Sequence, residues 1–277
     1  MSEDFAEWVG RSEQRVDVID AARSNALTAA LGVATDFGNG DPMPLLHHWL
    51  NSWDVRSPAD LGSDGHPAKG GFLPPVPLPR RMWAGGRLKF HQPLHFGESV
   101  TKTSTILKVS EKSGKSGQLV FVTVEHQLAG DNGLAVTEEQ DLVYREAAAP
   151  GSIKGPDGEG PEPQSTFHRT IFPDEVLLFR YSALTMNGHR IHYDLPYAKD
   201  EEAYPALVVH GPLMATCLVA MAQRELGGTL ATFDFRGQSP AFCGTTLHVC
   251  GEKTDEGISV WTEQGGAKCM VASATAP

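Results

Sequence analysis

Hydrophobic and polar residues alternate along several stretches of the chain, most clearly at residues 100–109 and 118–128. A repeat of two is the pattern of a strand with one buried face, and β-branched residues and Gly or Pro turns accompany it here. We therefore expect antiparallel strands in both halves of the chain. They should cover residues 87–90, 100–109, 118–128 and 134–144 in the first half, and residues 231–235, 245–250, 258–263 and 267–274 in the second.

Two segments have a helical pattern instead. Residues 16–32 bring small and apolar side chains to one face, which predicts an amphipathic helix. Residues 212–226 are apolar around almost the whole circumference, start at Pro212 and stop before Gly227, so this helix should be buried. We expect the apolar residues 176–181 to end a strand.

The two halves show the same order of strands and turns. A Pro and a Gly four residues apart precede the long strands of each half, Pro93 with Gly97 and Pro240 with Gly244. Hairpin signals lie at matching positions, with Asn-Gly before Leu134 in the first half and a Gly pair before Ala267 in the second. The shared order predicts an internal duplication of an antiparallel unit.

A segment rich in Gly, Pro and charge, residues 147–164, predicts a linker between a repeat at 1–146 and a second repeat at 165–277. The first half has a Pro-rich stretch, residues 71–87, where the second half has its apolar helix. We therefore expect the central helix of the first repeat to be lost, shortened or displaced.

Composition narrows the function classes. A formal net charge of -11 argues against nucleic acid as a partner, because binding phosphates needs a basic face. No apolar run reaches the roughly 18 residues of a membrane span, and the acidic start lacks the layout of a signal peptide. Four cysteines without Cys-x-x-Cys spacing favour reduced thiols. These features predict a cytoplasmic protein that binds neither nucleic acid nor a membrane.

Motifs in the second half surround the apolar helix and its approach. They are Tyr181, Thr185, Ile191-His192, Asp194, Tyr197-Ala198 and Val209-His210-Gly211. In this combination the chain resembles the MaoC-like family of type 2 enoyl-CoA hydratases. Within it, the chain is most similar to the double hot-dog subgroup that includes 3-methylfumaryl-CoA hydratase and the mitochondrial-type 3-hydroxyacyl-thioester dehydratases.

The resemblance implies an α+β double hot-dog fold, two antiparallel sheets in one chain, in which the C-terminal repeat wraps around a buried central helix. It also implies a hydro-lyase for acyl-CoA thioesters that needs no cofactor and no metal. The family's catalytic Asp falls on Asn187 here, and its Asn-Pro falls on His189-Arg190. A homodimer is compatible with the family, although a double repeat could also act as its own pseudo-dimer.

Hydration of a double bond conjugated to a thioester needs a base for the water, a partner that holds the water, and donors for the developing enolate oxygen. His192 can be the base, because the ordinary pKa of histidine lies near the working pH. Asn187 can orient the water, and the N–H of Gly211 at a helix N-terminus can stabilise the oxygen. Each residue has a structural alternative. His192 could be a loop histidine with satisfied hydrogen bonds, Asn187 a simple turn residue, and Gly211 only a tight entry to the helix. A metal site at His189, His192 and Asp194 is the weaker interpretation.

Substrate contacts are expected from both halves. Arg80, Arg81 and Arg87 could hold CoA phosphates or a substrate carboxylate, with Trp83 among them. A structural role, with Arg stacked on Trp83 or bridging the halves, is the alternative. The resemblance adds Tyr181 and His210 to the substrate-binding residues.

The function we expect is the reversible addition of water to a short branched dicarboxylic enoyl-CoA such as 3-methylfumaryl-CoA. A general 3-hydroxyacyl-thioester dehydratase and a non-catalytic acyl-CoA-binding hot-dog protein are the alternatives. A thioesterase is a further option, but it needs a carboxylate near the carbonyl, and only Asp194 lies close to the motif in sequence.

Overall fold

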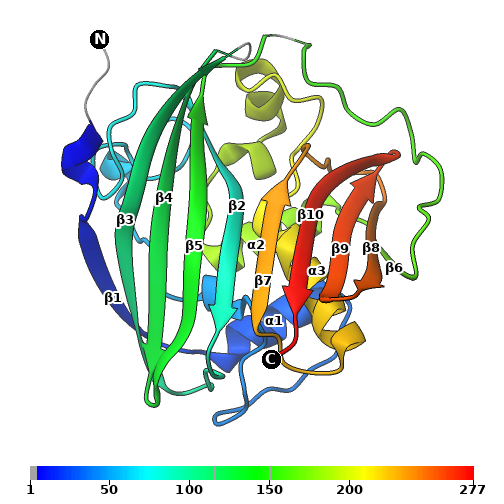
Figure 1. Ribbon diagram of the computed structural model, residues 1–277. Coiled ribbons are helices and arrows are strands. Elements are labelled where there is room, and N and C mark those ends of the chain that lie inside the picture. Colours follow the sequence, from blue (N-terminus) through cyan, green and yellow to red (C-terminus); the bar gives the residue numbers. More distant parts are fainter. Residues whose placement is uncertain (1–4, 115–116, 150) are drawn as a thin grey trace.

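The computed structural model describes residues 5–114, 117–149 and 151–277. Within these ranges, ten strands form one antiparallel sheet in the order β1-β3-β4-β5-β2-β7-β10-β9-β8-β6 (Figure 1). The first five are β1 (Ser12–Val18), β2 (Arg80–Phe90), β3 (Ser99–Gly114), β4 (Gly117–Gly130) and β5 (Gly133–Arg145). The others are β6 (Phe167–Ile171), β7 (Thr232–Gly237), β8 (Leu247–Thr254), β9 (Gly257–Gln264) and β10 (Ala267–Thr275).

The strand order reads the same from both edges of the sheet. Each half pairs its first strand with its third and its second with its fifth, so β1, β2, β3, β4 and β5 correspond to β6, β7, β8, β9 and β10. The halves join where β2 pairs antiparallel with β7, from Gly85 opposite Arg236 to Lys89 opposite Thr232. This arrangement confirms the expected duplication and the double hot-dog architecture; the two expected sheets are joined edge to edge into one.

One helix follows the first strand of each repeat: α1 (Ala21–Ala30) in the first repeat and α2 (Glu175–Thr185) in the second. The two helices pack against each other. Each begins after an aspartate whose side chain accepts a hydrogen bond from the helix: Asp20 from the N–H of Ala22, and Asp174 from that of Leu177. The structure corrects two expectations here. Residues 16–18 belong to β1, so the first helix starts later than 16, and residues 176–181 lie in α2 and end no strand. The periodicity of a short apolar run fits both a strand and a helix. The aspartates that cap the N-termini favour the helix at both positions.

The apolar helix of the second half, α3 (Gly211–Leu226), is confirmed. It is buried against β8, β9 and β10, and it ends at Gly227, whose φ of 80° is the left-handed conformation that glycine adopts readily (Figure 1). The first repeat has no counterpart of this length among the described residues. Val76 and Leu78 of the Pro-rich stretch pack there on Val120 and Tyr144 instead. The central helix of the first repeat is therefore replaced by an extended segment.

The connections carry short helical turns. They are η1 (Phe5–Trp8), η2 (His47–Leu50), η3 (Pro58–Asp60), η4 (Arg190–His192) and the π-helical turn η5 (Tyr197–Glu201). No helix in the described part of the chain is long and apolar enough to cross a membrane.

The described residues between Arg145 and Phe167 form no helix or strand, and they run along the outside of the second repeat (Figure 1). Glu159 accepts a hydrogen bond from the N–H of Thr246 at 3.1 Å, which ties this segment to the second repeat. Pro150 lies outside the described residues. We propose the division of the chain into residues 1–146, 147–164 and 165–277 on this basis.

Candidate active site

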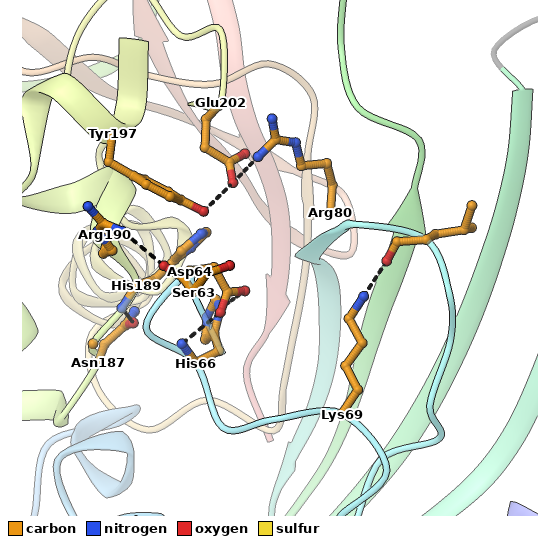
Figure 2. A network of polar contacts seen from close by, with 12 residues as sticks. Ser63, Asp64, His66, Lys69, Arg80, Asn187, His189, Arg190, Tyr197 and Glu202 are labelled. Carbon is orange, nitrogen blue, oxygen red and sulfur yellow. Dashed lines mark hydrogen bonds and ion pairs between the residues drawn. The ribbon is translucent and has the colours of Figure 1, made fainter. Parts of the chain in front are cut away.

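The site is built where the approach to α3 meets a loop of the first repeat. The second repeat contributes the turn after α2, with η4, and the residues that lead into α3. The first repeat contributes residues 61–67, a loop closed by a bridge between Leu61 and Pro67. Figure 2 shows Asp64 and His66 of this loop beside His189 and Arg190.

His192 is buried, and one of its two ring nitrogens is fixed by the backbone. Nδ1 lies 2.7 Å from the carbonyl oxygen of Val208, so Nδ1 carries the proton and donates it to this oxygen. Nε2 therefore keeps its lone pair, and no described residue hydrogen-bonds to it. Burial lowers the pKa of His192 to about 4, so the ring is neutral at pH 7 and is available as a base.

His210 supports this base. Its ring is stacked on that of His192, with the ring centroids 3.7 Å apart and the planes at 19°. Nε2 of His210 forms a 2.8 Å hydrogen bond with the hydroxyl of Ser182, and burial holds its pKa well below the usual value. Tyr181 also packs on His210, with the ring centroids 4.8 Å apart. His210, supported by Tyr181, thus holds the His192 ring in place.

Gly211 is the first residue of α3, and no described residue accepts a hydrogen bond from its N–H. A Cβ at this position would meet only the Met270 side chain, at 3.8 Å, so a ligand atom can approach the backbone closely. The free N–H and the positive end of the helix dipole favour a negatively charged oxygen. The geometry suits the oxyanion role expected for Gly211.

The side chain of Asn187 is engaged in its own turn. Its Oδ1 accepts a hydrogen bond from the N–H of His189 at 3.0 Å, a short-range turn contact. The left-handed residue of this segment is Met186, with φ of 51°, where α2 ends. The expected role of Asn187 in holding water stays a prediction.

Sequence reasoning missed Asp64 and His66 and considered His189 as a ligand only in the weaker metal alternative. His189 is in fact buried, and its ring lies 4.1 Å from that of His66 and 5.5 Å from that of His192. Nδ1 of His66 is 3.1 Å from a carboxylate oxygen of Asp64. No local motif marks residues 61–67; the only signal is a His and an Asp in a loop rich in Gly and Pro.

The three arginines do not act together. Arg80 forms an ion pair with Glu202 and also donates to the carbonyl of Glu201, so it ties the start of β2 to η5 (Figure 2). Arg87 points to solvent and pairs with Glu139 and Asp141, while its neighbour Leu88 is buried.

Arg81 is the one of the three whose charge acts on the site histidines. Its positive charge lowers the pKa of both His66 and His189, although burial is the larger cause for each. Trp83 packs with Trp49 and Phe235 at the junction of the two repeats, with no arginine stacked on it among the described residues. The structure thus brings Arg81 to the histidines and separates Arg80, Arg87 and Trp83 from them.

Comparison with known proteins agrees with this arrangement. Residues 46–243 match the model of the family described as hydroxyacyl-thioester dehydratase type 2. The chain belongs to this family. Mesaconyl-C(4)-CoA hydratase of Chloroflexus aurantiacus is 46% identical over 242 residues, which cover 87% of this chain and 86% of the relative. A mitochondrial hydroxyacyl-thioester dehydratase type 2 of Schizosaccharomyces pombe is 31% identical over 75% of this chain and 77% of its own length.

Solved structures share the fold of this type 2 dehydratase. HtdX of Mycobacterium tuberculosis superposes with a TM-score of 0.68 at 14% identity, over 96% of this chain and 100% of that chain. A MaoC-like dehydratase of Phytophthora capsici gives a TM-score of 0.68 at 14% identity, over 97% of both chains. The expectation of an acyl-thioester hydratase or dehydratase is confirmed by the family.

Two clusters among the described residues have atoms spaced for a metal ion: one is Glu162, His168 and His248 near the edge of the second repeat, and the other lies in the site. Ligand atoms of Asp64, His66 and His189 lie within 4.8 Å of one another. Asp194, named in the metal alternative from the sequence, is instead held by Arg190 at 2.7 Å. The positive charge of Arg81 beside the cluster opposes a cation there. The surroundings favour proton transfer or an anionic ligand over a metal.

Proposed function

We propose that this enzyme adds water to the double bond of a short branched dicarboxylic enoyl-CoA such as 3-methylfumaryl-CoA, giving citramalyl-CoA. The 46% identity to mesaconyl-C(4)-CoA hydratase supports this substrate class, since both names describe the same thioester. The observation that carries the proposal within the molecule is a pair of neighbouring cations, Arg81, whose charge acts on His66 and His189, and Lys69 next to it.

Lys69 and Arg81 lie close enough for the charge of Arg81 to lower the pKa of Lys69, after burial as the larger cause. Neither forms a direct ion pair among the described residues, although the charge of the Asp64 carboxylate acts on both; Lys69 donates to the carbonyl of Leu78 (Figure 2). Two neighbouring cations repel each other. Asp64 offsets only one of the two positive charges, so a further anion between them is favoured. A free substrate carboxylate needs such a partner, because an unpaired charge in a partly apolar pocket is costly.

The residues support the following steps. Nε2 of His192 takes a proton from water while the water oxygen bonds to the β-carbon. The electron pair of the double bond moves toward the thioester oxygen, and the N–H of Gly211 stabilises the negative charge there. One donor of this kind contributes roughly 3–4 kcal/mol in other enzymes. A proton added to the α-carbon then restores the thioester carbonyl.

The test compares two substrates. Arg81→Met and Lys69→Met should raise KM at least ~10-fold for 3-methylfumaryl-CoA, because each removes a charged hydrogen bond to the free carboxylate. KM for crotonyl-CoA, which has no such carboxylate, should stay within about threefold of wild type. Arg87→Met is the matched control on the solvent face and should change neither.

Two outcomes would reject the carboxylate role. An equal rise in KM for both substrates would assign the cations to the CoA phosphates, which both substrates carry. Wild-type preference for crotonyl-CoA over every dicarboxylic ester would favour a general 3-hydroxyacyl-thioester dehydratase, the function named for the Schizosaccharomyces pombe relative.

A further inference from the structure

Hydration moves two protons, and among the site histidines of the second repeat only His192 is suited to exchange one with the reactants. Water loses a proton and the α-carbon gains one. His192 has a free Nε2, but His210 is fully buried with its Nε2 bound to Ser182. His189 is also buried, beside His66 and His192, and burial lowers its pKa to about 2, so it carries no proton to give. The carboxylate of Asp194 is neutralised by Arg190. A second proton-transfer group therefore has to come from elsewhere.

The first repeat supplies a suitable group. Asp64 accepts from Nδ1 of His66, which leaves Nε2 of His66 free, and no described residue hydrogen-bonds to that atom. The side chain of His66 is 23% exposed, so Nε2 can be reached by a ligand. A carboxylate that holds one ring nitrogen while the other faces the reactants is the arrangement of an acid–base pair.

The loop that carries this pair is fixed to the loop of His192. The backbone N–H of Arg190 donates to the carbonyl of Asp64 at 2.9 Å, and its guanidinium donates to that of Ser63 at 3.1 Å (Figure 2). Gly65, with φ of 87°, lies so close to Gly188 that a Cβ on Gly65 would collide with the Gly188 carbonyl oxygen. The position of His66 relative to His192 is therefore set by contacts between the two repeats.

We propose that His66, oriented by Asp64, is the second proton-transfer group of the active site and acts at the α-carbon; this rests on the proposed hydratase function. In hydration, His192 takes the proton of water as the C–O bond forms. The protonated His66 gives its proton to the α-carbon as the C–H bond forms. Solvent water then returns a proton from His192 to His66, so the cycle closes.

The experiment measures kcat and KM against pH with 3-methylfumaryl-CoA. In wild type, kcat should fall at low pH as His192 is protonated. It should fall again on the high-pH side as His66 loses its proton, at a pH below the ordinary histidine pKa because burial lowers the pKa of His66. His66→Gln should lower kcat at least ~100-fold with KM nearly unchanged, and the fall at high pH should disappear. Imidazole added to His66→Ala should restore part of kcat.

Asp64→Asn keeps a hydrogen-bond acceptor for His66 but loses the charge that stabilises its protonated form. It should lower kcat about 10-fold and move the fall at high pH to lower pH, and it stays informative if His66→Gln does not fold. His91→Gln is the control, because His91 is exposed and bonds to Thr137 away from the site. It should match wild type.

The proposal is overturned if wild type is active and His66→Gln keeps kcat within about threefold, or keeps the fall at high pH. Stoichiometric zinc in the purified enzyme, lost in His189→Ala together with activity, would also overturn it in favour of a metal at the cluster. A wild type inactive on both 3-methylfumaryl-CoA and crotonyl-CoA would instead reject the proposed function.

Discussion

The two repeats keep the same scaffold and differ in what connects it. In each, a left-handed glycine ahead of the third strand donates to the residue just before the helix cap: Gly97 to Ile19 at 2.9 Å, and Gly244 to Pro173 at 3.0 Å. The caps themselves, Asp20 and Asp174, also correspond. Turns and caps are therefore the features that the duplication retained.

The connection between the first helix and the second strand has diverged. In the second repeat it contains His189, His192 and the buried helix α3. In the first repeat it holds a Pro-rich cover and the loop with His66, and no long helix lies there among the described residues. The sheet and its caps are thus alike in both repeats, while the candidate site is built from one variable connection of each.

The largest effect should come from breaking the connection of the second repeat. His192→Ala should lower kcat at least ~100-fold without unfolding the protein, because it removes the base and leaves the helix and sheet in place. Steady-state kinetics with a far-ultraviolet circular dichroism spectrum test this. His168→Ala, in an edge strand of the same repeat, is the control. Activity of His192→Ala within a factor of about three of wild type would contradict the base role.

The junction of the repeats should be the next most sensitive place. A Cβ on Gly85 would lie 2.5 Å from the backbone oxygen of Phe235, which cannot move aside without separating β2 from β7. Gly85→Ala should therefore lower the free energy of unfolding by about 1–3 kcal/mol.

Gly237→Ala is the matched control for this junction. Its Cβ would meet only the Ala84 oxygen, at 3.6 Å, an ordinary contact on the facing strand. Urea unfolding of both variants measures the difference. Equal stability of the two would show that the repeats tolerate a wider junction.

Acid should weaken both repeats through their buried imidazoles. Burial lowers the pKa of His126 in the first repeat to about 3 and that of His192 in the second to about 4. The unfolded chain binds these protons more readily, so their stabilisation is complete above about pH 6.5 and is lost as pH falls toward 4. At pH 5 each such group should cost on the order of 2 kcal/mol.

Urea unfolding at pH 7 and pH 5 tests this linkage. His126→Asn should lose less of its free energy of unfolding between pH 7 and pH 5 than wild type does, by the contribution of one buried imidazole. The same substitution at the exposed His91 should leave it unchanged. A loss equal to wild type in His126→Asn would mean that this histidine is already protonated in the folded protein.

Much of the fold could be predicted because it follows from local patterns. The alternation at 118–128 and the apolar run at 212–226 each fit one element, and the structure has β4 and α3 there. The run at 176–181 fits both a strand and a helix. Asp174, which caps the helix, distinguishes the two, but it lies outside the apolar run and was not considered in the prediction. Where the pattern was ambiguous, a single polar residue determined the element.

The site could be predicted only where it lies in one segment. His192 and Gly211 follow from a motif next to a helix start, whereas Asp64 and His66 reach them through contacts that join residues more than a hundred positions apart. The outward direction of Arg87 was available from the sequence, since strand neighbours alternate and Leu88 is apolar. The closeness of Arg81 to the histidines was not, because it depends on how the first-repeat loop crosses to the second repeat.

The smallest effect should come from Asn187, at the turn of the second repeat. Its Oδ1 accepts the N–H of His189, and an aspartate offers the same oxygen. Asn187→Asp should therefore keep kcat within a few-fold of wild type. Asn187→Ala leaves the N–H of His189 without this acceptor, so His189 and its neighbour His192 lose part of their orientation. We expect a loss of about 1 kcal/mol in stability and a kcat lowered about 10-fold. Kinetics and unfolding of both variants separate the two roles. If both Asn187→Ala and Asn187→Asp lose kcat while their stability stays normal, the amide itself holds the water and its contact within the turn is not what matters.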